Sequence, residues 1–501
     1  MRALPSRLII AGFAMTLSSL GSASGQTFDW EMRHRFRLII NEQDHDRLLA
    51  GLFSKNLHAN VLADIFGVRR NDAAQQASFS VATAWDQSAA QYRSAWFHDQ
   101  ARRIRVRVRG TKAADLCEYQ KDGGAILERK CGDWLDLDAR LGSSAIKWRI
   151  RNKPDWTDAN IEARDVKIAS LGDSYSSGEG NPHSLFSVFS EQFGVGAAAR
   201  WKDERCHRSL ISGPAIGAMR LALADPHASV TFVSFACSGA EVDDGILSRY
   251  FGRESVFQVG RRYEDAHRSP PTVFQETKLQ TQLSRLQALL CKDQPACAAR
   301  ETLDALIVGT GGNEVGFGAI VRLAYAGQID RTRAAVRRRI DEEFRRLKPQ
   351  FAELAQKITE LAPRRTLLMT YLDPTKNEAG QPCRTTVAHP GLNPLLELFG
   401  VGAISASESD FAAKEVLFRL EDFHRSVAKE HGWAFVGDFS RRHGFCTQSS
   451  FFRSFNEAGA LQGYLPRDDA AGVKFPFPTG VMHPNLYGHL HVSGRIYDAL
   501  K

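Results

Sequence analysis

The sequence predicts an α/β fold with a parallel sheet, preceded by a small β-rich region. From about Val166 onward, short apolar stretches alternate with stretches of helical periodicity, as in a parallel sheet covered by helices. Before Arg164 a period-two pattern dominates. The chain has 501 residues, 43% of them hydrophobic, which is enough for two or three domains. We expect a β-rich N-terminal domain over residues 26–164 and an α/β domain over residues 165–501.

Residues 1–25 have the pattern of an export signal. Two arginines precede an apolar stretch from Leu8 to Leu20, and small residues follow at 21–25. A membrane anchor is the alternative, but this stretch is shorter than the roughly 20 residues that span a bilayer. We therefore expect a secreted bacterial protein, located in the periplasm or outside the cell. We expect no transmembrane segment after signal removal.

Cysteine usage agrees with export. Eight cysteines, an even number in a chain that looks exported, are typical of disulfides in an oxidising compartment. Pairing them in chain order would close four local loops, although many other pairings stay open. The sequence has no CxxC pair and no His/Cys cluster at zinc spacing, so it does not indicate a structural metal.

The N-terminal region predicts strands with one basic face. Apolar and basic residues alternate over 103–109 and again over 146–151, as in half-buried strands. Together with the net charge of +8, such a face could contact an anionic surface. Long basic side chains also simply keep an exposed sheet face in solution. Nucleic acid is a poor candidate partner for an exported protein.

The elements of the α/β region follow from apolar runs and helical spacing. The expected strands are Val166–Leu171, Val230–Phe235, Ala305–Val308, Thr366–Tyr371 and Trp433–Val436. The expected helices are Leu279–Leu290, a long one over Val336–Leu361, and one over about Asp410–Glu430. Pro349 should kink or split the long helix. Residues 247–277 and 383–405 are interrupted by Gly and Pro, and we interpret them as insertions.

Four short segments near strand ends or near the C-terminus hold residues that suit catalysis. They read GDSYSSGEG over 172–180, ACSGA over 236–240, GTGGNEVGFG over 309–318 and MHPN over 482–485. Three of them follow predicted strands. In open α/β sheets, ligands bind at the carboxyl ends of the strands, so we expect these segments to meet at one edge of the sheet.

The residue types in these segments suit attack on a carbonyl group. A serine hydroxyl becomes a nucleophile when a histidine takes its proton, and Ser174 with His483 would supply that pair. The oxyanion that develops needs preorganised donors, which the backbone N–H groups of Ser174 and Gly239 and the side-chain amide of Asn313 would provide. Ser176 is a rival nucleophile on sequence alone.

In combination and order, the four segments resemble the conserved blocks of the SGNH (GDSL-like) hydrolase superfamily, over roughly residues 166–501. The serine, glycine, asparagine and histidine of that name match Ser174, Gly239, Asn313 and His483. The resemblance implies a three-layer α/β/α fold, ester hydrolysis through an acyl-enzyme on Ser174, and no cofactor. The segment around Ser174 is not the GxSxG nucleophile elbow of the α/β-hydrolases.

Within the superfamily, the ACSGA segment and the cysteine order are most similar to the secreted actinobacterial esterase and lipase branch. That similarity implies three disulfides in the catalytic domain, and the fourth falls to the N-terminal domain by elimination. The expected pairs are Cys206 with Cys237, Cys291 with Cys297, Cys383 with Cys446, and Cys117 with Cys131.

Two positions depart from the superfamily pattern. Many members have an aspartate three residues before the histidine, where this chain has Gly480. We expect a main-chain carbonyl at or near Gly480 to orient His483, as the similar branch implies. A carboxylate from elsewhere is the alternative, with candidates Asp438, Asp468 and Asp469. Glu314 stands where an aspartate is usual, with little expected consequence. We expect Asp173 to hold its turn.

These observations predict a serine esterase or lipase that cleaves carboxylic acyl esters. An O-acetylesterase acting on a cell-surface polysaccharide or peptidoglycan is the alternative with the same machinery, and the β-rich domain would then dock the substrate. The third class, a binding protein with a decayed site, is disfavoured because all four blocks are intact. The expected substrate is an ester of a lipid or of a glycan.

Overall fold

A computed structural model describes most of the chain. It covers residues 25–46, 82–86, 88–182, 201–203, 205–250, 252, 278–292, 297, 300–325, 328–384, 404–454, 457–458, 464–468, 474–478 and 480–501. The predicted export signal and the larger parts of both predicted insertions lie outside these residues.

The central feature is a parallel sheet of five strands in the spatial order β10-β9-β11-β12-β13. These strands are β9 (Thr157–Gly172), β10 (Ala228–Ser234), β11 (Ala305–Gly309), β12 (Thr366–Met369) and β13 (Ala434–Val436). All five predicted strands of the α/β region are present. In order of sequence this is a 2-1-3-4-5 arrangement, so the chain reverses direction across the sheet at β9.

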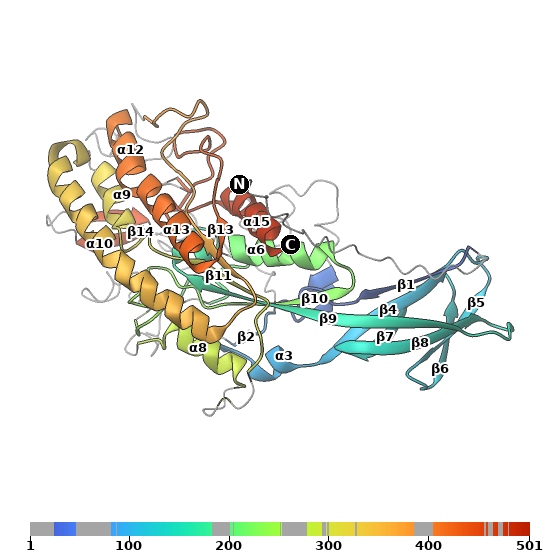
Figure 1. The fold of residues 1–501 in the computed structure, drawn as a ribbon. Coiled ribbons are helices and arrows are strands. Elements are labelled where there is room, and N and C mark those ends of the chain that lie inside the picture. Colours follow the sequence, from blue (N-terminus) through green and yellow to red (C-terminus); the bar gives the residue numbers. More distant parts are fainter. Residues whose placement is uncertain are drawn as a thin grey trace, which may run out of the picture.

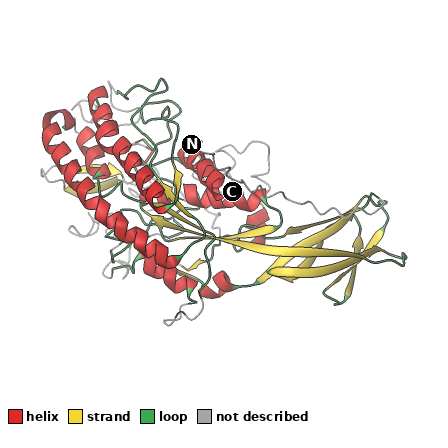
Figure 2. Ribbon diagram, viewed as in Figure 1, coloured by secondary structure: helices red, strands yellow, loops and turns green. Residues whose placement is uncertain are grey.

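Helices cover both faces of this sheet (Figure 1; Figure 2). One face carries α6 (Gly213–Ala224) and α15 (Leu486–Leu500), which contact each other along their length. The other face carries α8 (Gln282–Leu290), α10 (Ile329–Leu361) and α13 (Phe418–His431). The remaining helices are α3 (Ser94–His98), α4 (Ser174–Ser177), α9 (Phe317–Tyr325), α12 (Ala406–Ala412) and the π-helical η3 (Ala413–Leu417). The three layers confirm the predicted α/β fold class.

The long helix is a correction to one expectation. Pro349 lies inside α10, which runs unbroken over 33 residues, so the proline does not split it. Apolar residues at helical spacing keep the helix against the sheet on both sides of the proline, since Ile340, Leu347, Phe351 and Leu354 are all buried. Packing of this apolar face offsets the loss of one hydrogen bond at Pro349.

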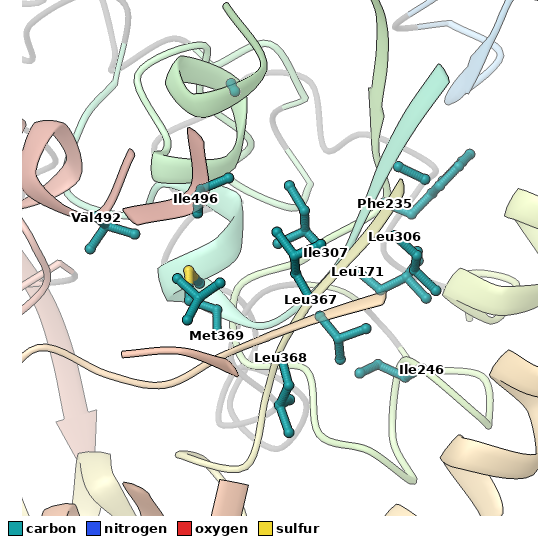
Figure 3. Packing of buried hydrophobic residues seen from close by; sticks show 14 of the residues in the cluster. Leu171, Phe235, Ile246, Leu306, Ile307, Leu367, Leu368, Met369, Val492 and Ile496 are labelled. Carbon is teal, nitrogen blue, oxygen red and sulfur yellow. The ribbon is translucent and has the colours of Figure 1, made fainter. Parts of the chain in front are cut away.

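The main core lies between the sheet and the helices. Leu171, Leu306, Ile307, Leu367 and Leu368 project from adjacent strands and are fully buried (Figure 3). Full burial of each such side chain stabilises the fold by about 1.5 to 3 kcal/mol. Because the parallel strands are buried on both faces, they appear in the sequence as continuous apolar runs.

The N-terminal part forms a β-rich extension that projects from the catalytic sheet (Figure 1). One sheet has the order β1-β4-β7, and the first half of β9 continues through β8 and β5 to β6. The strands are β1 (Thr27–Met32), β4 (Ala101–Arg109), β5 (Leu116–Lys121), β6 (Ile126–Lys130), β7 (Leu135–Arg140) and β8 (Gly142–Ile150). A separate small core fills this extension.

The boundary predicted between residues 164 and 165 lies within a strand. That boundary falls inside β9, whose first half pairs with β8 and whose second half pairs with β10 and β11. In addition, Phe36, Leu38 and Phe97 lie in the core of the α/β part, and Phe36 forms a bridge to Val230 of β10. The β-rich extension and the α/β part therefore share a continuous strand, and some residues that precede position 164 pack in the core of the α/β part.

The basic face of the extension is paired with acidic side chains. Across β1 and β4, and across β5 and β8, the ion pairs are Arg105 with Glu31, Arg107 and Arg109 with Asp29, and Arg149 with Glu118. Acidic side chains of the same extension neutralise these arginines. This agrees with the interpretation that the basic residues simply keep an exposed sheet face in solution. Contact with an anionic surface stays a prediction.

Two short hairpins complete the described elements. They are β2 (Trp85–Asp86) with β3 (Gln91–Tyr92), and β14 (Tyr464–Asp468) with β15 (Lys474–Pro478). Among the helices that are described, none is both long and apolar enough to cross a membrane.

All eight cysteines form disulfides in the predicted pairs, which confirms the pairing. The bonds are Cys117–Cys131, Cys206–Cys237, Cys291–Cys297 and Cys383–Cys446. Cys291–Cys297 joins the C-cap residue of α8 to a residue six positions later. Cys383–Cys446 joins the chain after β12 to the chain after β13.

We predict that the mature protein contains no titratable thiol and that reduction lowers its melting temperature. Each disulfide typically contributes about 2 to 4 kcal/mol by restricting the unfolded chain. Thiol titration of the denatured, unreduced protein, followed by thermal melts with and without reductant, measures both effects. Several reactive thiols in the unreduced protein would contradict this pairing.

Candidate active site

The segment after β9 begins with a close approach of two backbones. Gly172 has φ 139°, and a Cβ placed there would lie 2.0 Å from the carbonyl oxygen of Gly309 in β11. Only glycine fits this position. The next residue, Asp173, caps the short helix α4 by accepting a hydrogen bond from the N–H of Tyr175. Ser174 is therefore the first residue of α4, at the carboxyl edge of the sheet.

Ser174 and His483 are brought together across 309 residues of sequence. The Nε2 atom of His483 lies 2.8 Å from Oγ of Ser174, and both side chains are buried. The Nδ1 atom lies 3.1 Å from the carbonyl oxygen of Val481. A carbonyl only accepts, so this contact assigns the proton to Nδ1 and leaves Nε2 to accept the proton of Ser174.

The carbonyl beside Nδ1 belongs to Val481, not to the predicted Gly480. The carbonyl of Gly480 accepts the backbone N–H of His483 at 3.1 Å instead. The difference of one residue follows from the turn, in which Gly480 and Met482 have φ of 82° and 59°. Such a turn rotates successive carbonyls in different directions, which the sequence pattern does not reveal.

The histidine turn is fastened to the serine segment by several hydrogen bonds. The hydroxyl of Tyr175 donates to the carbonyl of Met482 at 3.0 Å, and the amide of Asn181 donates to the carbonyl of Pro484 at 2.7 Å. Arg453 exchanges backbone hydrogen bonds with Met482 and His483, and its guanidinium donates to the carbonyl of Gly180. The distance between Ser174 and His483 is therefore held by the scaffold on both sides.

Burial sets the protonation of the histidine. It lowers the pKa of His483 below the ordinary value, and the charge of Glu179 and the carbonyls of Val481 and Gly480 oppose this lowering. A lowered pKa keeps the imidazole neutral at neutral pH, which is the form that can accept a proton.

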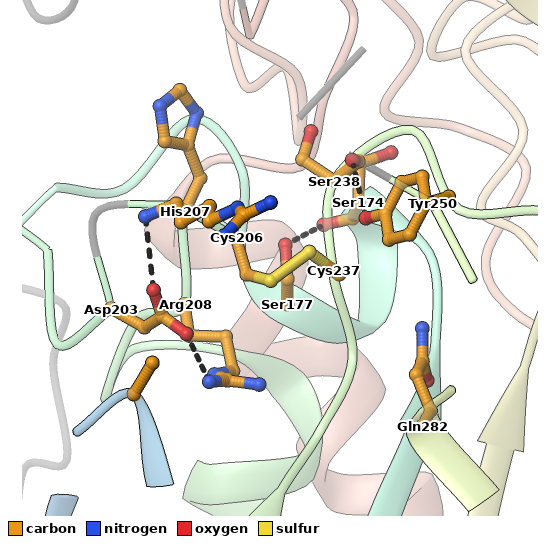
Figure 4. The surroundings of a disulfide bond; sticks show 12 residues. Ser174, Ser177, Asp203, Cys206, His207, Arg208, Cys237, Ser238, Tyr250 and Gln282 are labelled. Carbon is orange, nitrogen blue, oxygen red and sulfur yellow. Dashed lines mark hydrogen bonds and ion pairs between the residues drawn. A yellow bond between two sulfur atoms is a disulfide. The ribbon is translucent and has the colours of Figure 1, made fainter. Parts of the chain in front are cut away.

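The segment after β10 is held against the serine turn. The N–H of Cys237 donates to the carbonyl of Gly172 at 3.0 Å, and the N–H of Ser238 donates to the carbonyl of Cys206 at 3.1 Å. The disulfide Cys206–Cys237 lies beside Ser174 and Ser177 (Figure 4). Gly239 follows with φ 78°, a conformation that favours glycine.

The segment after β11 holds the loop after β10 through two hydrogen bonds. The amide of Asn313 donates to the carbonyl of Ala240 at 2.9 Å, next to Gly239. The adjacent Glu314 accepts the N–H of Val242 at 2.6 Å. Glu314, for which the sequence predicted little consequence, therefore fixes the loop that carries Gly239.

Two other polar residues of the serine segment, Asp173 and Ser176, have structural partners. Ser176 is completely buried, and its hydroxyl donates to the carbonyl of Gly309 at 3.1 Å. Asp173 accepts a hydrogen bond from the hydroxyl of Tyr371, and burial raises its pKa to about 7. Among the described contacts, it is thus Ser174 and not Ser176 that meets the histidine.

Two residues that support the site were not singled out from the sequence. Gln282 donates to the carbonyl of Gly172 and accepts its N–H, each at 2.8 Å. Tyr371 donates to Asp173 and accepts the N–H of Gly312 at 2.8 Å. Tyr371 stands just after β12, where the strand-end rule points to it. Gln282 begins a helix after a predicted insertion and gives no such signal.

The alternative carboxylates do not meet the histidine where they are described. Asp438 forms an ion pair with Arg425 at 2.7 Å, and its side chain is 68% exposed. The side chain of Asp468 and the whole of Asp469 lie outside the described part of the chain. Within that part, no group of three or more His, Cys, Asp or Glu side chains is placed to hold a metal ion.

Comparison with known proteins gives solved structures only. No protein-family model matches the sequence, and no curated protein matches it. An extracellular lipase from Streptomyces rimosus is 18% identical, with 67% of this chain and 100% of that chain covered and a TM-score of 0.37. Phospholipase A1 from Streptomyces albidoflavus is 15% identical, covers 67% and 99%, and has a TM-score of 0.34.

A third structure extends over more of the chain. It is a carbohydrate esterase family 2 enzyme with a carbohydrate binding domain from Myceliophthora fergusii, 12% identical, with 78% and 87% covered and a TM-score of 0.28. Because all three TM-scores lie below 0.5, we rest the assignment of the site on the strand order and contacts of this chain itself.

The buried carboxyl of Glu314 predicts a loss of stability as pH rises. Burial raises its pKa from 4.5 to about 8, so the folded protein holds a proton that the unfolded chain releases. Stability therefore falls between about pH 4.5 and pH 8. Replacing it by Gln keeps an acceptor for Val242 and removes this loss. We expect E314Q to melt about 2 to 4 °C above the wild type at pH 9 and close to it at pH 5.

Thermal melts of both proteins at the two pH values measure this difference. A wild type and an E314Q variant with the same pH dependence would show that Glu314 is ionised in the folded protein.

Proposed function

We propose that this protein is a serine ester hydrolase in which Ser174 is the nucleophile and His483 is its general base. The observation that carries the proposal is the 2.8 Å contact between Oγ of Ser174 and Nε2 of a buried histidine whose Nδ1 is committed to a carbonyl. The position at the carboxyl end of β9, where the strand order reverses, supports a substrate site there.

The reaction would begin when Oγ of Ser174 attacks the carbonyl carbon of the ester and its proton passes to Nε2 of His483. The tetrahedral intermediate then collapses, the ester oxygen leaves with that proton as an alcohol, and an acyl-serine remains. Water, deprotonated by His483, attacks the acyl-serine and releases the carboxylic acid. Ser174 regains the proton from His483.

The developing oxyanion would be held by the N–H groups of Ser174 and Gly239 and by the amide of Asn313. The bond from Asn313 to the carbonyl of Ala240 supports this role, since it uses one amide hydrogen and aligns the side chain with the loop of Gly239. Donors fixed in advance stabilise the intermediate without a cost of reorientation.

The carbonyl of Val481 would take the orienting part of a triad aspartate. It fixes the tautomer and the ring direction of His483, as the aspartate does in a triad. A carbonyl is a dipole without net charge, so it orients the ring more than it stabilises the imidazolium.

We propose that the substrates are carboxylic acyl esters and that the protein works outside the cytoplasm of a bacterium. Four disulfides support an oxidising compartment. Hydrolysis of p-nitrophenyl esters from acetate to long acyl chains, compared with deacetylation of acetylated glycans, tests this function. No release from any ester would refute the proposal, and release from acetylated glycans alone would favour the O-acetylesterase.

We predict that S174A loses ester hydrolysis by more than about 1,000-fold, because the covalent route disappears. The matched variant S176A should keep turnover within about threefold, since Ser176 contributes only a hydrogen bond to Gly309. Steady-state kinetics with a p-nitrophenyl ester, with thermal melts as the folding control, measure both. The opposite ranking would make Ser176 the nucleophile.

For N313A we predict a fall in kcat of about 100- to 1,000-fold with a smaller change in KM, as for the loss of other oxyanion donors. The same kinetic assay measures it. If kcat stayed at the wild-type value in a folded variant, Asn313 would have only the structural bond to Ala240.

A further inference from the structure

A further buried carboxylate lies within the serine segment and is not used in the proposed reaction. Glu179 is 1% exposed and stands five residues after Ser174 in the same turn. Its backbone N–H donates to the carbonyl of Ser174 at 3.0 Å. A carboxylate taken out of water in this way costs free energy unless a charge or donor compensates it.

The partner of Glu179 is a buried imidazole. Nδ1 of His207 lies 2.6 Å from the carboxylate, and its ring stacks on Trp201 with centroids 4.4 Å apart. His207 has φ 47°, in the left-handed region, and it follows Cys206 of the disulfide to Cys237. The backbone and its covalent tie thus hold the imidazole at the carboxylate.

The turn that carries Glu179 packs against the catalytic histidine. The residue after Glu179 is Gly180, and a Cβ placed there would lie 3.3 Å from Cβ of His483. Burial lowers the pKa of His483, and the charge of Glu179 opposes that lowering more than the carbonyl of Val481 does. The charge of His207 acts in the opposite direction and is the weaker of the two.

We propose that Glu179 supplies the negative charge that stabilises the protonated form of His483 during turnover, while the carbonyl of Val481 mainly orients the ring. The two functions of a triad aspartate are then divided between a neutral acceptor in contact with the imidazole and a buried carboxylate in the adjoining turn. The effective dielectric constant of a buried site is low, so a charge in a neighbouring turn can stabilise a protonated imidazole without touching it. The proposal rests on the proposed ester hydrolysis by Ser174 and His483.

The charged and titratable groups around His483 decide whether the local electrostatic potential favours its protonated or its neutral form. Arg453 from the segment before the hairpin and His489 from α15 are the other charged or titratable neighbours described, together with the hydroxyl of Tyr175 in α4. Burial lowers the pKa of His489 to about 3, so it is neutral in the working range. Arg453 is a cation. Asp173, the buried carboxyl directly before Ser174, has a pKa raised to about 7 and is therefore mainly protonated on the acidic side of the profile, where Glu179 is the described anion beside the turn.

The test replaces each member of the pair. In E179Q the amide keeps an acceptor for His207 and loses the charge, so the acidic limb of the pH profile should move down by about half a unit or more, with a plateau rate about 3- to 10-fold lower. In H207N the carboxylate stays and the imidazole that lowers the pKa of His483 is removed, so the limb should move up; asparagine also tolerates the left-handed backbone. D438N, which removes an exposed paired carboxylate, is the matched control and should leave the limb in place.

The readout is the rate at which phenylmethylsulfonyl fluoride inactivates the full-length protein between pH 4.5 and 9, with ester hydrolysis alongside. The reagent sulfonylates Ser174 with loss of fluoride and needs only the serine and its base, so it separates the two proposals. An absence of inactivation in the wild type would refute the proposed function. Inactivation with an unmoved limb in folded E179Q would overturn the role of Glu179 alone.

H207N decides the question if E179Q does not fold, because an unmoved limb in that variant also overturns the proposal. Opposite shifts in the two variants support it, since a purely structural role of the pair would lower the rate in both without moving the limb. A shift in D438N instead would assign the charge to Asp438.

Discussion

The site depends on the contact between the backbones of β9 and β11 at Gly172. There, two parallel strands end so close together that no side chain fits between Gly172 and the carbonyl of Gly309. The backbone groups at this contact all form hydrogen bonds. The carbonyl of Gly172 accepts from Cys237 and Gln282, and its N–H donates to Gln282. The N–H of Asp173 donates to the carbonyl of Gly309. Three segments that are distant in sequence therefore meet the serine turn in a fixed register.

The rest of the site follows from that register. Because α4 starts directly after the contact, Ser174 emerges at the carboxyl edge, and the loops after β10 and β11 can close on it from both sides. Asn313 and Glu314 hold one loop through Ala240 and Val242. The histidine turn is then fastened to the serine segment through Tyr175 and Asn181, and to the segment of Arg453 through backbone hydrogen bonds.

Burial is the second constraint. The effect of burial on a carboxyl group at this site depends on whether its partner is a neutral donor or an imidazole. Burial raises the pKa of the Glu314 and Asp173 carboxyls to about 8 and about 7, although backbone and hydroxyl donors beside them oppose the shift. Glu179 is buried beside an imidazole instead. A polar group without charge orients its neighbour, whereas a paired carboxylate can also bias the charge of a base nearby. A hydrolase that orients its histidine with a carbonyl would gain from such a carboxylate.

The sequence by itself determined the five strands, the helices on one face of the sheet and the residues that meet at the sheet edge. Buried strands need continuous apolar runs, and reactive side chains must follow them, so both features are written locally. The four disulfides also agree with the pairing that the resemblance implied. Only the tertiary structure decided that Val481 and not Gly480 faces His483, because the turn angles at Met482 set which carbonyl points to the ring.

Tertiary contacts likewise decided the continuity of β9 through the expected domain boundary and the roles of Gln282 and Glu314. Their partners lie 110 and 72 residues away in sequence. Such pairings depend on strand register and on the path of the connecting loops, and neither leaves a periodic signal around the residue itself. The alternation that predicted the first half of β9 and the apolar run that predicted its second half are different local patterns, although one strand carries both.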